Sequence, residues 1–244
     1  MDQFLHYFAW GETGWGDELF FGAVVTVQIA FTSYAFGLAL GLIGAGARLS
    51  HSRLVSLPAF AFSIIFRGLP ELLIISLIYF GGSLAIRALL APFGIQRYVE
   101  FNPFLSGVLA LGLVIGAYVT ELFRGAILAV SPGQGDAARA LGLGWLQSFF
   151  LIILPQAFRI ALPGLANLWM TNLKNTALLS VIGLTDMVRV AYLGAASTRS
   201  PLPFFTAVAV GYLILTYISQ LGLVRLEVYA NRGTTESVPK AGQG

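Results

Sequence analysis

Long apolar stretches without a charged residue are the feature that most limits what this sequence can fold into. They are Leu19–Ala47, Leu54–Phe66, Leu72–Ile86, Phe101–Thr120, Ala140–Phe158, Ile160–Leu173 and Ser200–Val224. A helix that crosses the hydrocarbon core of a bilayer needs about 20 mostly apolar residues. Strong alternation of polar and apolar residues, the mark of an outer-membrane barrel, is missing. The sequence therefore predicts an all-α membrane protein.

The overall composition supports this prediction. Of the 244 residues, 57% are hydrophobic and only 10% are charged, and the mean hydropathy is +0.81. Soluble domains carry about a quarter charged residues, so water-soluble enzymes, nucleic-acid binders and disordered proteins are excluded. The net charge of +3 comes from scattered Arg and indicates no nucleic-acid partner. Cysteine is absent, which excludes a disulfide framework, a thiolate zinc site and a cysteine nucleophile.

Two regions decide the number of spans. Residues 57–86 form one span if Arg67 and Glu71 lie inside it. Hydropathy alone allows two spans between 140 and 183, which gives six in all. Prolines at 155 and 163 and an arginine at 159 favour a broken entry and a single span there, which gives five.

Basic residues favour the five-span arrangement with the N-terminus outside. The inner side then holds eight of them: Arg48, Arg53, Arg124, Arg139, Arg159, Arg225, Arg232 and Lys240. The outer side holds four: Arg87, Arg97, Arg189 and Arg199. This is the direction that the positive-inside rule requires, whereas six spans divide the same residues equally.

We therefore predict one transmembrane domain over residues 1–230, with a periplasmic N-terminus and a cytoplasmic C-terminus. Its spans are expected at about 19–47, 57–86, 102–124, 160–183 and 202–226. Residues 231–244 are polar and are expected to form a disordered cytoplasmic tail.

The inner loop at about 131–155 contains the pattern of a short helix. Pro132 and Gly133 make a turn, an acid at 136 suits a helix N-terminus, and alanines at 137, 138 and 140 are strong helix formers. Gly142 would end the helix. From composition alone this segment is either a helix that another protein contacts or a plain amphipathic linker.

The spacing in this loop resembles the EAA motif of ABC-transporter permeases. That motif runs Glu-Ala-Ala, three residues, Gly, nine residues, Ile, any residue, Leu-Pro. Here Asp136-Ala137-Ala138, Gly142 and Ile152-Ile153-Leu154-Pro155 fall in the same places. The one departure is Asp for Glu at 136, which keeps the charge.

Further segments extend the resemblance over about residues 18–232. Glu121–Ala126 is similar to the family's segment before the loop, and Leu173–Leu178 with Val181–Leu184 is similar to its fourth span. Arg67-Gly68-Leu69-Pro70 matches the Arg-Gly-x-Pro signature of the polar amino-acid branch. Glu71 after that proline, with Gly41–Gly46, most resembles the Q-type membrane subunit of histidine/lysine/arginine/ornithine, octopine and nopaline importers.

The resemblance implies a permease of the type I ABC importer fold in the bacterial inner membrane, carrying a polar, basic amino acid or opine. It implies a second, M-type permease subunit, two ATPase subunits and a periplasmic substrate-binding protein as partners. The loop would couple to the ATPase through Asp136, Ala137, Ala138, Arg139 and Gly142. Neither lysine follows a glycine in a Gly-Lys-Ser/Thr phosphate loop. ATP and Mg would therefore bind the partner ATPases, and this chain would be no enzyme.

Three charged residues are predicted to lie inside the bilayer: Arg67, Glu71 and Lys174. Intramembrane charges cost about 2.5–3.5 kcal/mol each on insertion scales and are functional by default. We hypothesise that Glu71 receives the cationic end of the solute, and that Arg67 or Lys174 receives a carboxylate. The alternative is that Arg67 and Glu71, four residues apart, only neutralise each other.

Other polar residues have two interpretations each. Glu121 beside Arg124 is expected near the cytoplasmic boundary, as a structural ion pair or an inner gate. The polar residues of span four line a solute pathway or hydrogen-bond between helices; they are Asn172, Asn175, Thr176 and Ser180. Small residues at Gly37, Gly41 and Ala45 favour close helix packing.

Three other functions were weighed. A membrane-embedded hydrolase needs a nucleophile–base or metal constellation, but the only histidines are His6 and His51, so we expect no catalytic and no metal site. An ATP-independent channel or secondary transporter is compatible with the composition but leaves the loop motif unexplained. A non-transporting scaffold subunit is disfavoured by the intramembrane charges.

Overall fold

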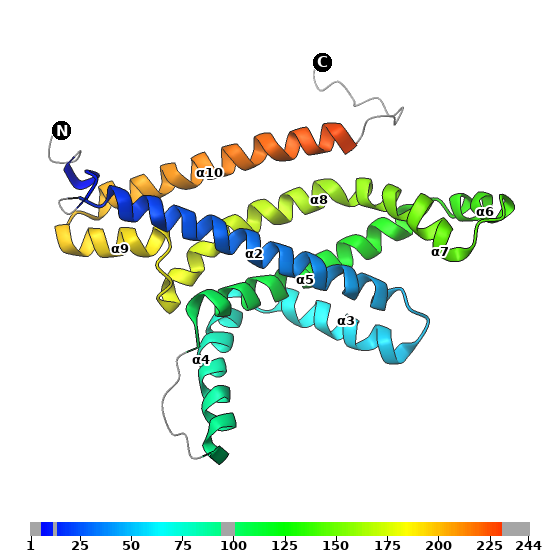
Figure 1. Cartoon of the computed structure of the whole chain (residues 1–244), viewed down its shortest axis with the longest axis horizontal. Helices are drawn as coiled ribbons and strands as arrows, with labels where there is room; N and C mark the ends of the chain where they lie inside the picture. Colours follow the sequence, from blue (N-terminus) through cyan, green and yellow to red (C-terminus); the bar gives the residue numbers. More distant parts are fainter. Residues whose placement is uncertain (1–5, 12–13, 94–100, 231–244) are drawn as a thin grey trace.

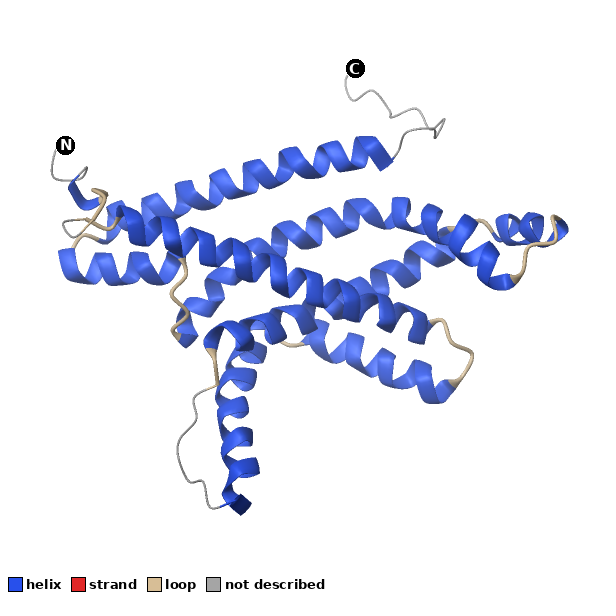
Figure 2. Cartoon of the chain, in the orientation of Figure 1, coloured by secondary structure: helices blue, strands red, loops and turns tan. Residues whose placement is uncertain are grey.

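The computed structural model describes residues 6–11, 14–93 and 101–230, and every regular element within these ranges is a helix (Figures 1 and 2). The tail expected at 231–244 lies outside the described residues. The elements are α2 (Gly16–Arg48), α3 (Arg53–Gly68), α4 (Glu71–Leu90), η1 (Ala91–Phe93), α5 (Pro103–Ala129), α6 (Pro132–Ala140), α7 (Trp145–Ser148), η2 (Phe149–Ile153), α8 (Leu154–Asn175), η3 (Thr176–Ile182), α9 (Met187–Thr198) and α10 (Pro201–Ala230).

Five helical segments of the described chain are long and apolar enough to cross a membrane. They are Gly16–Arg48, Glu71–Leu90, Pro103–Ala129, Trp145–Ile182 and Pro201–Ala230. The ambiguous region between 140 and 183 therefore holds one crossing. Its entry is irregular, because the π-helical turn η2 precedes Pro155, whose ring nitrogen has no proton to donate to the preceding turn.

The expected single helix over 57–86 is two helices. α3 ends at Gly68, and Leu69 is extended with φ −94° and ψ 145°, because the ring of Pro70 disfavours helical geometry in the residue before it. α4 then starts at Glu71 and runs crosswise to α2 and α5 (Figure 1). The span prediction for this region was wrong in its continuity, and the 20-residue candidate span is α4 alone.

Small residues let α2 and α5 pack closely along their length. A Cβ atom on Gly37 would lie 2.7 Å from the Ile115 side chain, and one on Gly41 would overlap the side chain of Val119. Gly44 would meet Thr120 in the same way. Helix backbones can approach this closely only where a side chain is missing, so the glycines set the distance between α2 and α5.

α5 is the central helix of the chain. Its buried residues join two apolar clusters, one with α4 and η3 through Leu111 and Val114, and one with α2 and α8 through Val119 and Phe123. α10 is peripheral, since only Phe204 and Val208 along its length are buried. Most of the apolar surface of α10 therefore faces outward from this chain.

α9 packs against the beginnings of α2 and α10 (Figure 1). Its N-cap is Asp186, whose Oδ1 accepts a hydrogen bond from the Arg189 backbone N–H at 2.9 Å. Asp186 is fully buried, and its Oδ2 has no hydrogen-bond partner among the described residues. The Met187 N–H donates to Thr26 Oγ1 of α2 at 3.4 Å, which joins this cap to the bundle.

Replacing Gly41 with Ala should destabilise the bundle, because the new methyl group would overlap Val119 and lie 2.9 Å from the Gly116 carbonyl oxygen. Overpacking of this kind costs about 1–3 kcal/mol. We expect a lower midpoint of thermal unfolding for the purified protein. Gly46→Ala is the matched control on the same helix, since a Cβ there meets nothing within 4 Å. Equal midpoints for the two variants would show that the α2–α5 distance is set elsewhere.

Asp186 should make stability depend on pH. Burial raises the pKa of its carboxyl to about 6, above the unfolded value of about 3.9, so the folded state favours the neutral form. Stability should fall as the pH rises from about 4 to about 6 and stay level above that range.

Asp186→Asn keeps a cap acceptor and removes the charge, so it should gain on the order of 2 kcal/mol at pH 8. Asp186→Ala should be less stable than Asp186→Asn by about 1 kcal/mol, because it loses the cap. Thermal unfolding at pH 5 and pH 8 measures both effects. A pH dependence that is the same in wild type and Asp186→Asn would contradict the assignment.

Candidate functional site

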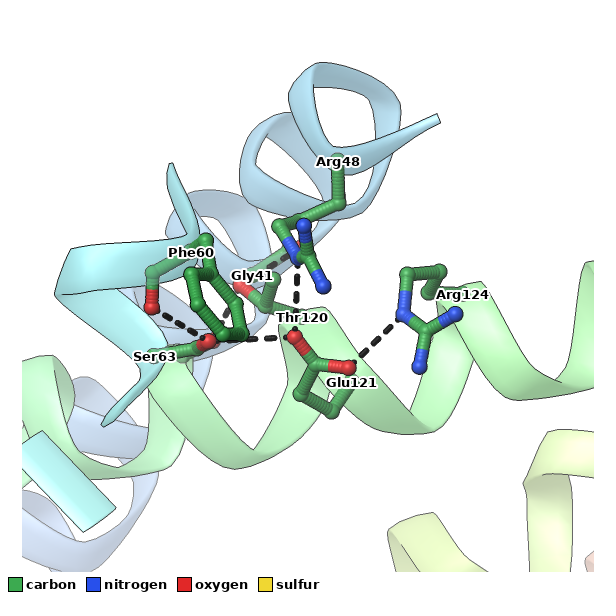
Figure 3. Close-up of polar contacts among 8 residues, drawn as sticks. Gly41, Arg48, Phe60, Ser63, Thr120, Glu121 and Arg124 are labelled. Carbon is green, nitrogen blue, oxygen red and sulfur yellow. Dashed lines mark hydrogen bonds and ion pairs between the residues drawn. The ribbon is translucent and has the colours of Figure 1, made fainter. Parts of the chain in front are cut away.

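A cluster of charged side chains joins three helices around Glu121 (Figure 3). Glu121, on α5, accepts from Arg48 Nε of α2 at 3.1 Å through Oε1 and from Arg124 Nε at 2.7 Å through Oε2. Ser63 Oγ of α3 lies 3.0 Å from Oε1. One carboxylate therefore connects α2, α3 and α5.

Neighbouring contacts hold this cluster in place. The Arg48 guanidinium lies over the Phe60 ring, 4.5 Å from its centroid. Thr120 Oγ1, next to Glu121, lies 3.4 Å from the Gly41 carbonyl oxygen. The side chain of Glu121 is 15% exposed, so its ion pairs are partly withdrawn from solvent and are screened less than surface pairs.

The anchored helix α3 carries the predicted site residue Arg67 one turn beyond Ser63. Arg67 is exposed, and its guanidinium lies 5.9 Å from the centroid of the Tyr118 ring on α5. Glu71 is half-buried at the start of α4. The two do not form an ion pair, because the chain is broken at Leu69 and Pro70 and they do not share a helix. Arg67 and Glu71 therefore do not neutralise each other by an ion pair in this structure.

Lys174 lies in the last turn of α8, where the helix dipole favours a cation, and it is exposed. No hydrogen bond or ion pair among the described residues joins it to Arg67 or Glu71. Among the described residues, all three predicted intramembrane charges are therefore without a counter-ion.

Three of the four predicted polar residues of span four make side-chain hydrogen bonds in this structure. Asn172 is fully buried, and its Nδ2 donates to the Ala30 carbonyl at 2.8 Å and to Ser33 Oγ at 3.0 Å. Thr176 Oγ1 lies 2.8 Å from the Leu173 carbonyl oxygen, and Ser180 donates to the Ala177 carbonyl. Asn175 is half-buried. This arrangement favours hydrogen bonding between and within helices, the alternative that the sequence left open.

The inner loop folds into the helix α6 (Pro132–Ala140), which Figure 1 shows at one end of the molecule; we call it the α6 end. Gly142 follows with φ +78°, a conformation that glycine adopts without strain. Asp136 is in the second turn and pairs with Arg139, so the expectation that it lies at the helix N-terminus was wrong. The reason is that the helix already begins at Pro132.

Ala137 is exposed on α6, whereas Ala138 is buried against the rest of the chain. Beyond α6, large apolar side chains are exposed: Leu141 at 80%, Trp145 at 75% and Leu146 at 60%. A cluster of exposed apolar side chains next to a short helix suits contact with another protein. The sequence reasoning missed these residues, although a Trp beside a polar loop was a visible signal.

The sequence reasoning also missed Arg48 and Ser63 as partners of Glu121. Arg48 entered the sequence argument only as a basic residue of the inner side. Its separation from Glu121 by 73 positions gives no local pattern that could connect them.

Among the described residues, no group of three or more His, Asp or Glu side chains is arranged to hold a metal ion.

Comparison with known proteins gives consistent matches. Residues 37–227 match the family model described as "Binding-protein-dependent transport system inner membrane component". The chain is 44% identical to the nopaline transport system permease protein NocQ of Agrobacterium fabrum, over 92% of this chain and 95% of the relative. It is 37% identical to the histidine/lysine/arginine/ornithine transport system permease protein HisQ of Salmonella typhimurium, over 88% and 93%.

A solved structure agrees with these matches. A chain of the crystal structure of an amino acid ABC transporter with histidines superposes with a TM-score of 0.76 at 31% identity. The superposition covers 88% of this chain and 94% of that one. The all-helical architecture with five candidate spans therefore resembles that of a chain in a solved amino acid ABC transporter.

Glu121→Gln should destabilise the protein by about 1–3 kcal/mol, because it leaves Arg48 and Arg124 partly buried without a counter-charge. Ser63→Ala should cost less, about 1 kcal/mol, since only one hydrogen bond is lost. Thermal unfolding of the purified protein measures both.

The matched control is Asp136→Asn. It breaks the Asp136–Arg139 pair, whose side chains are 66% and 73% exposed, and exposed pairs contribute at most about 1 kcal/mol. If Glu121→Gln and Asp136→Asn shifted the unfolding midpoint equally, the cluster would not be what connects α2, α3 and α5.

Proposed function

The chain belongs to the family of inner membrane components of binding-protein-dependent transport systems, and from this premise we propose that it carries a basic amino acid or an opine. It is the multi-pass permease subunit of an ABC importer, and ATP hydrolysis belongs to a separate subunit. The observation that carries the solute class is the similarity, over about nine tenths of the chain, to relatives named for nopaline, octopine and basic amino acids.

The partners follow from the same family. ATPase and binding-protein partners are implied by it, and we propose two ATPase subunits, with ATP and Mg bound to them, and a second, M-type permease subunit. We also propose that the N-terminus is periplasmic, which places the α6 end in the cytoplasm. The positive-inside distribution of Arg and Lys supports this orientation.

Coupling to the ATPase is proposed for the loop around α6. Asp136, Ala137, Arg139 and Gly142 lie on its exposed part, and the ion pair between Asp136 and Arg139 supports the short helix. The exposed side chains of Leu141 and Trp145 extend the surface that a partner would cover. Movement of this loop would be transmitted directly to α8, because α7, η2 and α8 follow one another without an intervening loop.

The Glu121 cluster supports a role at the inner gate. It joins α3, which carries Arg67, to α2 and α5 (Figure 3). Ser63 precedes Arg67 by four residues on α3, toward the Arg53 end of that helix, and Figure 1 shows this end on the side of α6. In alternating access, ATP-driven closure of the ATPases would move the α6 loop and open the outer side, and hydrolysis would reset the inner side. Breaking and remaking the contacts between Glu121, Arg124 and Arg48 would accompany these steps.

Solute contact is proposed for the three intramembrane charges. Glu71 would receive the cationic end of the solute, and Arg67 or Lys174 its carboxylate. Their exposed or half-buried positions and their lack of counter-ions in this chain support the proposal. An unpaired charge at membrane depth is costly unless a ligand or a partner compensates it.

The function is tested by uptake into proteoliposomes that contain the complete transporter. We expect uptake of arginine or octopine that requires both ATP and the periplasmic binding protein. Flux through this chain without ATP would instead support a channel or a secondary transporter.

Glu71→Gln should raise the concentration of arginine needed for half-maximal uptake by about tenfold, because one favourable charge contact is lost. Glu18→Gln is the matched control: it removes an exposed carboxylate from the beginning of α2 and should leave this concentration unchanged. The same half-maximal concentration in Glu71→Gln and wild type would refute the role of Glu71.

A further inference from the structure

A groove that contains three polar residues among eight lining residues lies between α8 and α10, apart from the predicted site residues. Its volume is about 230 Å³, which corresponds to space for roughly seven or eight water molecules. Asn167 of α8, and Gln220 and Glu227 of α10, contribute polar side chains to it. None of these was singled out by the sequence reasoning.

These three polar side chains have no partners in the described chain. No hydrogen bond or ion pair involves the side chains of Asn167, Gln220 or Glu227 there. Arg225 is two residues from Glu227 but makes no ion pair with it and does not line the groove. The carboxylate is therefore available to a cation from outside the chain.

The position of the groove argues against lipid tails as its occupant. Both helices belong to candidate membrane spans, and Gln220 lies two turns before Glu227, about 10 Å further from the α6 end. Carboxamide groups at this depth face hydrocarbon only at a cost in free energy, because hydrocarbon offers no hydrogen-bond partner. A polar molecule that enters from the α6 end satisfies all three groups.

The chemistry of the lining selects a cation. A carboxylate and two carboxamide oxygens accept hydrogen bonds from ammonium or guanidinium N–H groups, and no basic side chain lines the groove. On α8, Lys174 follows Met170 of the groove by four residues and therefore lies on the same helix face. Along α8, the lining of the groove therefore ends one turn before a residue proposed to bind the solute carboxylate.

We propose that the α8–α10 groove is a second solute site, in which Glu227 holds the ammonium or guanidinium group of the transported molecule toward the α6 end. This inference rests on the proposed function, since it takes the solute to be a basic amino acid or opine. Glu227, Gln220 and Asn167 lie on the cytoplasmic side of Lys174 in the proposed orientation. The site therefore binds the solute after it leaves the middle of the membrane and before release.

Equilibrium binding to the nucleotide-free complete transporter tests this site. The complex is placed in nanodiscs without phosphatidylethanolamine, and the Kd of arginine is compared with that of citrulline, whose side chain has the same shape without the charge. Glu227→Gln should weaken arginine binding at least about threefold, the size expected for one partly exposed charge pair, and should leave citrulline unchanged. Glu227→Asp should restore most of the loss.

Arg225→Gln is the control, because it removes an exposed charge from the same turn of α10 without changing the groove. An equal Kd for arginine in wild type and Glu227→Gln, with wild-type transport intact, would overturn the inference and leave the proposed function standing. A wild-type complex that transports no basic solute would instead refute the proposed function.

Two further outcomes assign the groove to another occupant and so overturn the inference. In one, phosphatidylethanolamine added to the nanodiscs displaces arginine from wild type but not from Glu227→Gln, which makes an amino-lipid headgroup the ligand. In the other, Glu227→Gln prevents copurification of the partner permease while Glu227→Asp does not, which places a basic side chain of the partner there.

Discussion

The close approach of α2 and α5 is the constraint on which the rest of the structure depends. Gly37 and Gly41 remove the side chains that would separate the two backbones. In lipid there is little hydrophobic drive to join helices, so contact between them relies on such packing and on hydrogen bonds. Because α5 also packs against α3, α4 and α8, its position against α2 affects where Arg67, Glu71 and Lys174 lie on those helices.

Sequence reasoning predicted what depends on local pattern. Span number followed from hydropathy and charge, close packing of α2 from the spacing of Gly37 and Gly41, and α6 from Pro132 to Gly142. It wrongly predicted one continuous span over residues 57–86, because hydropathy does not reveal that the backbone becomes extended at Leu69. It also missed the partners of Glu121 and the cap at Asp186, since contacts between distant spans leave no trace in a single sequence.

The break at Leu69 and Pro70 gives the Glu121 cluster its importance. With α3 no longer continuous with α4, the orientation of α3 depends on its own contacts with α2 and α5. Ser63 and Phe60 supply these where the carboxylate and guanidinium groups meet. A polar contact of this kind can break and re-form during a transport cycle, whereas separating α2 from α5 would lose their close packing along several turns. The two kinds of contact therefore suit different tasks: a fixed frame and a movable helix.

Two groups of charged residues in the helices differ physically. Glu121, Arg48 and Arg124 neutralise one another within this chain, so their cost in the membrane is offset before any partner arrives. Glu71, Lys174 and Glu227 have no counter-ion in the described chain. Since an unpaired charge in a membrane span is unfavourable, it persists only if something outside the chain compensates it at some stage of the cycle. A charged solute that passes along these residues compensates each in turn, which is why unpaired charges at successive depths fit a permease better than a static scaffold.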